Sequence, residues 1–113
     1  MRRFEEIIAW QKSKELTIDT YDSFKTCKDF SFKDQIQRAA LSILNNIAEG
    51  FERNTDKELI HFLYIAKGSC GEVRSMLYIA LELGYLNKSK FDKMYSKSEE
   101  ISKIISGFIR KIK

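Results

Sequence analysis

A row of polar side chains between residues 35 and 53 is the part of this sequence that could do chemistry. It places amide, guanidinium, hydroxyl and carboxylate groups at steps of three or four residues: Gln35, Arg38, Ser42, Asn46, Glu49 and Arg53. Such steps put side chains on one face of an α-helix. An apolar row runs beside it, formed by Ile36, Ala40, Ile43, Ile47 and Phe51. The polar groups could bind a ligand or RNA, or they could tie this helix to another.

We favour the structural interpretation of this polar row. Buried charges must be paired, and such networks can fix the register of neighbouring helices. In this interpretation Arg38 pairs with a carboxylate, Asn46 satisfies leftover donors, and the row is tethered to Glu72 of the next helix. The predicted network comprises Gln35, Arg38, Asn46, Glu49, Arg53 and Glu72. The alternative is a cluster that contacts a ligand or RNA.

The sequence offers no set of residues for enzyme chemistry. His61 is the single histidine, and no nucleophile, base and orienting group can be named around it. Glu58 and His61 have Glu-x-x-His spacing, but a di-iron bundle needs two such pairs. Cys27 and Cys70 are too far apart for a CxxC motif and are interpreted as free thiols. We therefore expect no catalytic residue, no metal and no cofactor.

Basic residues are the clearest indication of a binding function. The chain has 20 Lys and Arg against 16 Asp and Glu, a net charge of +4. The predicted nucleic-acid contacts are Arg2, Arg3, Lys88, Lys90, Lys93, Lys97, Arg110, Lys111 and Lys113. Acidic residues such as Asp92, Glu99 and Glu100 interrupt the basic run, so an ordinary solvated face is the alternative.

Long helices must position these residues. The chain has no proline and five glycines, which favours helices over a turn-rich β protein. We predict helices over 4–24, from Ser31 to 53, from 56 to 83, and from about 88 to the end. Three glycines inside these helices, Gly50, Gly68 and Gly71, suggest close approach of neighbouring helices. At 113 residues the chain forms one domain, 1–113.

Helix caps mark the expected boundaries. Ser31 with Asp34, and Thr55 with Glu58, follow the capping-box spacing. Gly84 can take the left-handed position after the third helix, and Asn87 or Ser89 can cap the fourth. The predicted fold is all-α, an antiparallel up-down-up-down four-helix bundle with short loops.

The last two helices show the strongest apolar patterns. The fourth has a heptad seam with one polar member: Phe91, Met94, Ser98, Ile101, Ile105, Phe108 and Ile112. The third has a core row, Leu59, Phe62, Ala66, Val73, Leu77 and Ala80, and further apolar residues around it, Ile60, Leu63, Tyr64, Ile65, Tyr78, Ile79 and Leu81. A helix that is apolar nearly all round is buried nearly all round. We therefore expect self-association through this third helix, with scattered exposed apolar residues, which are common on proteins, as the alternative.

These residues also carry a resemblance to a known family. The sequence resembles the four-helix-bundle proteins encoded in intervening sequences of bacterial 23S rRNA genes, also labelled ribosomal protein S23-like. The matching residues are Trp10, Gln11, Gln35, Arg38, Ala39, Ser42, Asn46, Ile47, Ala48, Glu49, Gly50, Arg53, Ala66, Gly68, Ser69, Glu72, Gly84 and Tyr85. Two departures are Phe30-Ser31, where the family often has Phe-Pro, and Cys70, where a larger aliphatic residue is usual.

The resemblance implies an assembly more than a function. Proteins of this kind form homopentamers, arranged as a barrel with a central channel. A similar bundle, the accessory variability determinant of diversity-generating retroelements, binds a reverse transcriptase and nucleic acid. The partners implied here are further copies of the chain, and RNA, the ribosome or a protein resembling a reverse transcriptase.

The sequence thus predicts a non-enzymatic homo-oligomer that binds RNA or another nucleic acid. A structural or protein-interaction scaffold is the alternative, and it gains weight if acidic residues interleave evenly with the basic ones. The first ten residues lack the apolar block of a signal peptide, and the apolar stretch 76–86 is too short to span a bilayer. We therefore expect a cytoplasmic protein without membrane contact.

Overall fold

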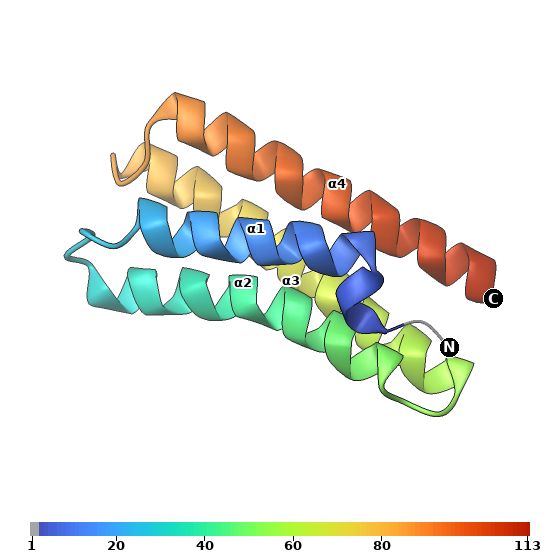
Figure 1. Cartoon of the computed structure of the whole chain (residues 1–113). Coiled ribbons are helices and arrows are strands. Elements are labelled where there is room, and N and C mark those ends of the chain that lie inside the picture. The colour runs from blue at the N-terminus through green and yellow to red at the C-terminus, as the bar shows by residue number, and fades with distance from the viewer. Residues whose placement is uncertain (1–2) are drawn as a thin grey trace.

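Four α-helices form an antiparallel bundle in this computed structural model (Figure 1), which describes residues 3–113. A short 3-10 helix, η1 Phe4–Glu6, precedes α1 Ile8–Ser23, α2 Phe30–Phe51, α3 Asp56–Glu82 and α4 Lys88–Ile112. Each helix packs against its two neighbours, so α1 lies diagonally across from α3 and α2 across from α4. The predicted all-α, up-down-up-down bundle is confirmed. It measures 43 × 21 × 20 Å.

Three predicted helix ends are confirmed by their hydrogen bonds. Thr55 Oγ1 accepts from the Glu58 N–H at 3.2 Å and begins α3, and Asn87 Oδ1 accepts from the Lys90 N–H at 2.8 Å and begins α4. Gly84 follows α3 with φ +76°. Its N–H donates to Leu81 O, and the Tyr85 N–H donates to Ala80 O at 2.8 Å. This pair of bonds closes the last turn of α3 as a Schellman motif.

The start of α2 differs from the prediction. Asp29, not Ser31, is the N-cap, because its Oδ1 accepts from the Phe32 N–H at 3.1 Å. The second oxygen, Oδ2, accepts from the Tyr85 hydroxyl at 2.8 Å. One carboxylate therefore caps α2 and joins it to the turn after α3. The expected first helix from Phe4 is also broken, since Ile7 has an extended backbone between η1 and α1.

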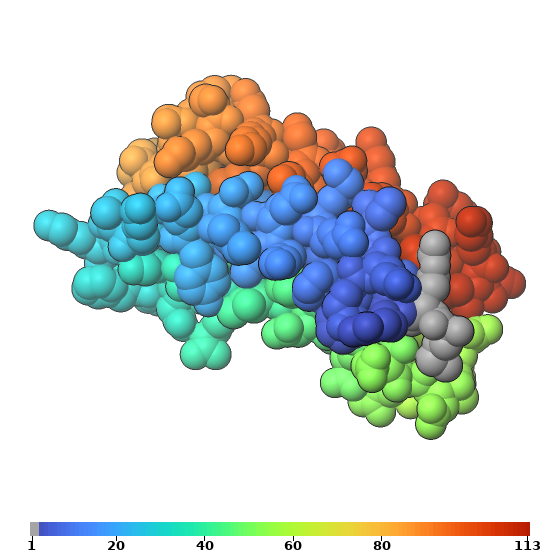
Figure 2. All heavy atoms as spheres, in the orientation of Figure 1, coloured from blue at the N-terminus to red at the C-terminus, as the bar shows by residue number. Residues whose placement is uncertain are grey.

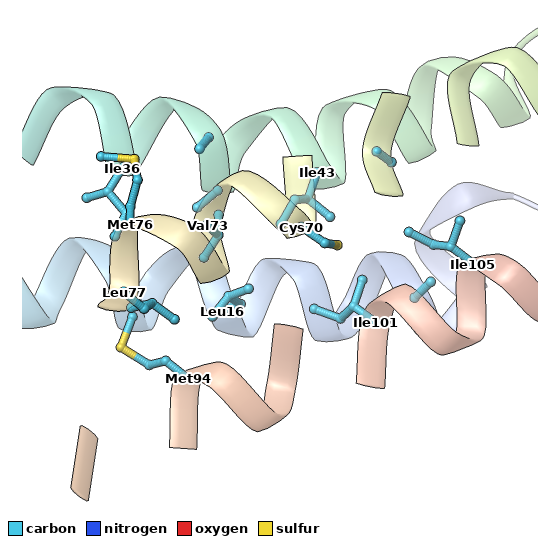
Figure 3. Close-up of a cluster of buried hydrophobic side chains, with 14 of the residues drawn as sticks. Leu16, Ile36, Ile43, Cys70, Val73, Met76, Leu77, Met94, Ile101 and Ile105 are labelled. Atoms are coloured by element: carbon cyan, nitrogen blue, oxygen red, sulfur yellow. The ribbon is translucent and has the colours of Figure 1, made fainter. Parts of the chain in front are cut away.

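All four helices contribute to one apolar core (Figure 3). Leu16 of α1, Ile43 of α2, Val73 and Leu77 of α3, and Ile101 of α4 are fully buried in it. The seam predicted for α4 is buried from Phe91 to Ile105 and becomes half-buried at its end. No helix in residues 3–113 has both the length and the apolar character needed to cross a membrane.

The apolar excess of α3 is confirmed in part. Leu63, expected outside the core row, is 1% exposed and belongs to the core. Tyr64, Ile65, Tyr78 and Ile79 do face outward, with between 39% and 52% of each residue exposed. The third helix therefore carries large apolar side chains that one chain does not cover.

Only one of the three helix-interior glycines marks a close approach of two helices. A Cβ atom added to Gly50 of α2 would lie 3.0 Å from Leu59 Cδ1 and 3.1 Å from Phe62 Cβ of α3. At Gly68 a Cβ atom would meet nothing within 4 Å, and at Gly71 only Arg74 Nη2 at 3.9 Å. The expectation of close packing is wrong for these two, which face away from the neighbouring helices.

Candidate nucleic-acid interface

The charged members of the polar row on α2 lie at the surface. The Arg38 side chain is 78% exposed, and its Nε donates to Asp34 Oδ2 one turn earlier at 2.8 Å. Gln35 and Glu72 are also exposed. Among the described residues Arg38 forms no ion pair with α3 and Glu72 forms none at all. The predicted tether of the polar row to Glu72 is therefore wrong. The predicted pairing of Arg38 with a carboxylate is confirmed, but the partner is Asp34, four residues earlier on the same helix.

The end of this row forms a surface network across the turn into α3. Arg53 Nε lies 3.3 Å from Glu49 Oε2, and Arg53 Nη1 lies 3.6 Å from Glu58 Oε2. The guanidinium also stacks over the Phe62 ring, 4.8 Å from its centroid. Because all three charged side chains are more than a third exposed, solvent weakens these pairs. They join the end of α2 to the start of α3.

A short chain of hydroxyls makes the polar contact between α2 and α3. Asn46 Nδ2 donates to Ser42 O at 2.8 Å and to Ser42 Oγ at 3.0 Å. Ser69 Oγ of α3 donates to Ser42 Oγ at 2.8 Å. The structural role predicted for Asn46 is thus confirmed, and its partner is the half-buried Ser42. The role of Ser69 was not predictable from the sequence, since small hydroxyls also occur throughout exposed helix faces.

A second buried hydroxyl explains the polar member of the α4 seam. Ser98 Oγ donates to Cys70 O at 3.1 Å and accepts from Arg74 Nη1 at 3.2 Å. Ser98 therefore joins α4 to α3 inside the core. Burial raises the pKa of the neighbouring Cys70 thiol to about 11, which leaves it protonated and a poor nucleophile at neutral pH.

Two of the lysines predicted to contact nucleic acid at the start of α4 are paired with carboxylates. Lys97 is 19% exposed, and its Nζ lies 2.8 Å from Glu15 Oε1 and 3.9 Å from Asp19 Oδ2 on α1. The hydrogen bond from Lys97 lowers the pKa of Glu15. Lys88 Nζ lies 2.6 Å from Asp92 Oδ1. Lys97 thus ties α4 to α1.

The exposed lysines nearby also have acidic neighbours. Lys90 and Lys93 line a hollow of about 100 Å³ together with Asp19 and Asp22 of α1. A wider depression of about 590 Å³ on the outer side of α4 mixes Lys93, Lys97 and Lys103 with Glu99 and Glu100. A phosphate group in either place would meet carboxylates as well as ammonium groups. This end of the basic surface is interleaved with acid.

The other end of α4 has a different charge distribution. Arg110 and Lys113 meet Lys67 of α3 around a hollow of about 180 Å³ between the two helices, which we call the α3–α4 hollow. Its lining is Tyr64, Lys67, Ser106, Ile109, Arg110 and Lys113, without an Asp or Glu side chain from residues 3–113. None of the three cations forms an ion pair in that range. In Figure 1 the start of α3 and the end of α4 lie at the same end of the bundle.

Lys67 was not among the predicted nucleic-acid contacts, because in the sequence it is separated from the other basic residues.

The remaining predicted nucleic-acid contacts lie outside this hollow. Lys111 is exposed, one position away from Arg110. Arg3 pairs with Glu5 at 3.0 Å, and Arg2 lies outside the described residues. His61 is exposed and packs edge-on against Phe62, with ring centroids 5.2 Å apart.

Comparison with known proteins agrees with this architecture. A solved structure described as a protein with unknown function from the S23 ribosomal protein family, from Bacteroides thetaiotaomicron VPI-5482, superposes with a TM-score of 0.85. It has 24% sequence identity, and the match covers 90% of this chain and 98% of that chain. At this identity the likeness shows the fold.

Sequence comparisons give the family. No curated protein matches the chain in a sequence search. The model of the 23S rRNA-intervening sequence protein family matches residues 5–107, which is most of the chain. The chain therefore belongs to the 23S rRNA-intervening sequence protein family.

Proposed function

We propose that this protein is a non-enzymatic, self-associating bundle that binds RNA through the basic end of α3 and α4. The observation that carries the proposal is the sorting of the cations. Lys88 and Lys97 lie against carboxylates, whereas Lys67, Arg110 and Lys113 gather around a hollow that no Asp or Glu side chain of residues 3–113 lines. Unneutralised cations are the groups that attract the phosphate backbone.

Self-association would multiply this attraction. In the pentamer suggested by the family resemblance, five chains of +4 each carry +20. Repeating one weak phosphate contact around a ring raises the overall affinity, because the later contacts are intramolecular. The proposed partners are further copies of this chain and RNA, free or within the ribosome. A protein partner such as a reverse transcriptase is compatible with the same surface.

The outward apolar side chains support a ring rather than a two-fold dimer. Ile18 and Tyr21 are exposed on α1, and Ile65 and Ile79 are exposed on α3. Because α1 and α3 are diagonal in the bundle, these two faces point to opposite sides. A contact between two different faces of neighbouring copies is heterologous, and it closes into a ring when the rotation permits.

Salt-dependent RNA binding tests the proposed function. A fluorescently labelled structured RNA is titrated with the protein at 50 and 200 mM salt, and anisotropy gives the Kd. Contacts to about three phosphates predict an affinity loss of about 20- to 40-fold over that range. Absence of binding at 50 mM salt would contradict the proposal.

A protein-interaction scaffold is the second candidate. The acids that surround Lys90, Lys93 and Lys97 favour it, because a surface of mixed charge repels and attracts a phosphate chain at once. Persistence of the oligomer without affinity for any RNA at low salt would support the scaffold over the nucleic-acid binder.

A further inference from the structure

We infer that the α3–α4 hollow is a site for single-stranded nucleic acid, with one backbone phosphate in the hollow and one base stacked on Tyr64. This inference rests on the proposed function, which is that the protein binds nucleic acid. It adds where the nucleic acid binds, that it is single-stranded, and which residues contact it. Its basis is that three cationic side chains, the Ser106 hydroxyl and the exposed Tyr64 side chain lie together between α3 and α4.

The lining of the hollow suits a phosphate group. Lys67, Arg110 and Lys113 supply ammonium and guanidinium donors on its rim, and Ser106 adds a hydroxyl. The apolar side of Ile109, which is almost completely buried, lines the same space. Charge-assisted hydrogen bonds from such groups to phosphate oxygens are shorter and stronger than neutral ones. A single phosphate could therefore contact both helices.

Tyr64 lies beside the hollow with 47% of the residue exposed. Lys113 Nζ is 3.1 Å from its hydroxyl and 5.5 Å from the centroid of its ring. These two distances place the ammonium beyond the hydroxyl end of the ring and near the ring plane, so the ring face stays open. A nucleic-acid base could therefore stack on that face while the ammonium contacts the phosphate in the adjoining hollow.

A stacking platform selects single strands. In a duplex the bases are stacked on one another, whereas an unpaired base can turn outward onto an aromatic side chain. The hollow is also a local feature of two helices and gives no long flat surface for a duplex. These features favour an unpaired strand over duplex RNA.

A second hollow between α3 and α4 differs from the first because an acidic side chain lines it. Arg74 and Lys103 line a next depression of about 130 Å³ together with Glu99 and Ser102. Farther along, Tyr78 is exposed, but its ring packs against Phe91 and Tyr95 at centroid distances of 5.2 and 5.4 Å. The Glu99 carboxylate would repel a phosphate at that second position. The proposed site therefore comprises only the α3–α4 hollow and Tyr64.

Anisotropy titrations with a 12-nucleotide A-rich single strand and its duplex test the site. We expect Tyr64→Leu to weaken single-strand binding about tenfold or more, because stacking is lost. Tyr64→Phe keeps the ring and should stay within about threefold of the unmodified protein. The double variant Lys67→Gln, Arg110→Gln should lose both affinity and part of the salt dependence.

The matched control is the double variant Lys90→Gln, Lys93→Gln, which removes the same charge at the acid-rich end of α4. It should weaken binding by less than the hollow variant at 50 mM salt. Equal losses from both double variants, or equal affinity for strand and duplex with no effect of Tyr64→Leu, would overturn the inference. If the unmodified protein binds no RNA, the proposed function itself fails.

A second measurement needs no variant. A single strand carrying 4-thiouridine is irradiated with the intact protein, and the crosslinked peptides are identified by mass spectrometry. Crosslinks in the segments that contain Tyr64 or Arg110 support the site. Crosslinks confined to the first turns of α4 would place the strand elsewhere and contradict it.

Discussion

Buried hydroxyls at single positions provide the polar contacts that hold the helices in register. Ser98 of α4 bonds to Cys70 O and receives a bond from Arg74, and Ser69 of α3 bonds to Ser42. Each satisfies a buried polar group without the cost of burying a charge. The charged residues that the sequence suggested for this role lie instead in solvent, where their ion pairs contribute little to stability.

The Cys70 thiol gives a prediction for alkaline pH. Its pKa is raised by burial to about 11 in the folded protein, while in the unfolded chain the thiol ionises near its ordinary pKa of about 8.5. A raised folded-state pKa gives stability that is present below the unfolded pKa and is lost as pH rises through the folded one. Between pH 8.5 and 10.5 this group should therefore cost the fold about 2 kcal/mol.

Urea unfolding of the unmodified protein and of Cys70→Ala, at both pH values with reductant present, measures this effect. The variant is less stable overall because it leaves a cavity, but its stability should fall less with pH. Parallel losses in the two proteins would show that Cys70 does not cause the alkaline destabilisation.

At the scale of the helices, a glycine permits close packing only where it faces a neighbouring helix. Gly50 lets α2 approach α3 closely, whereas Gly68 faces open space. Helix ends show the same dependence on surroundings. Thr55 and Asn87 cap α3 and α4 from local spacing, but at the start of α2 the choice of Asp29 is reinforced by Tyr85, 56 residues later.

A pair of glycine substitutions tests the contact of α2 with α3. Gly50→Ala should destabilise the fold by about 1–3 kcal/mol, because its new Cβ atom crowds Phe62 Cβ, which cannot move without its helix. Gly107→Ala in α4 is the matched control. Its Cβ atom would lie 3.9 Å from Arg110 Nη2, an ordinary contact, so alanine should stabilise the helix by up to about 1 kcal/mol. Chemical unfolding gives both values. Gains from both substitutions would show that α2 and α3 have room to separate.

At the scale of the whole molecule, apolar side chains face outward on opposite sides of a small bundle. Figure 2 shows one broad face, where α1 lies between α4 and α2. Ile18 and Tyr21 belong to α1, while Ile65 and Ile79 belong to α3. Large apolar patches on a protein surface mark contacts with other molecules, and we propose that these side chains take part in such contacts. The proposed ring would bring the two faces of successive copies together.

Mixing two variants tests the proposed ring. Ile18→Gln, Tyr21→Gln removes one face, and Ile65→Gln, Ile79→Gln removes the other. Each variant alone should be monomeric by light scattering, because every contact in a heterologous ring needs both faces. An equimolar mixture should form heterodimers and stop there, since each variant keeps one intact face.

The control is Phe30→Gln, at the start of α2, where the phenylalanine is 71% exposed. This variant should assemble as the unmodified protein does. If only the α3 variant becomes monomeric, the contact is between identical faces, and the heterologous ring is wrong.

Local residue spacing by itself determined the helical class, the four helices, and the caps at Thr55 and Gly84, and it narrowed the cap of α4 to Asn87 or Ser89. These features depend on residues within one or two turns, so a single chain segment contains their physical cause. The apolar rows of α3 and α4 likewise predicted much of the core, because helical periodicity assigns each residue to a face, although Leu63 was placed on the wrong face.

Only the tertiary structure decided which charges are free. Lys97 looked available from its sequence, but Glu15, 82 positions away, neutralises it. Lys67 looked isolated, but the fold brings it to the same hollow as Arg110. Electrostatic interactions act through space between elements, so their outcome depends on how α1, α3 and α4 are packed. Residues along the sequence thus identified the family, while the packing of α3 against α4 formed the candidate site.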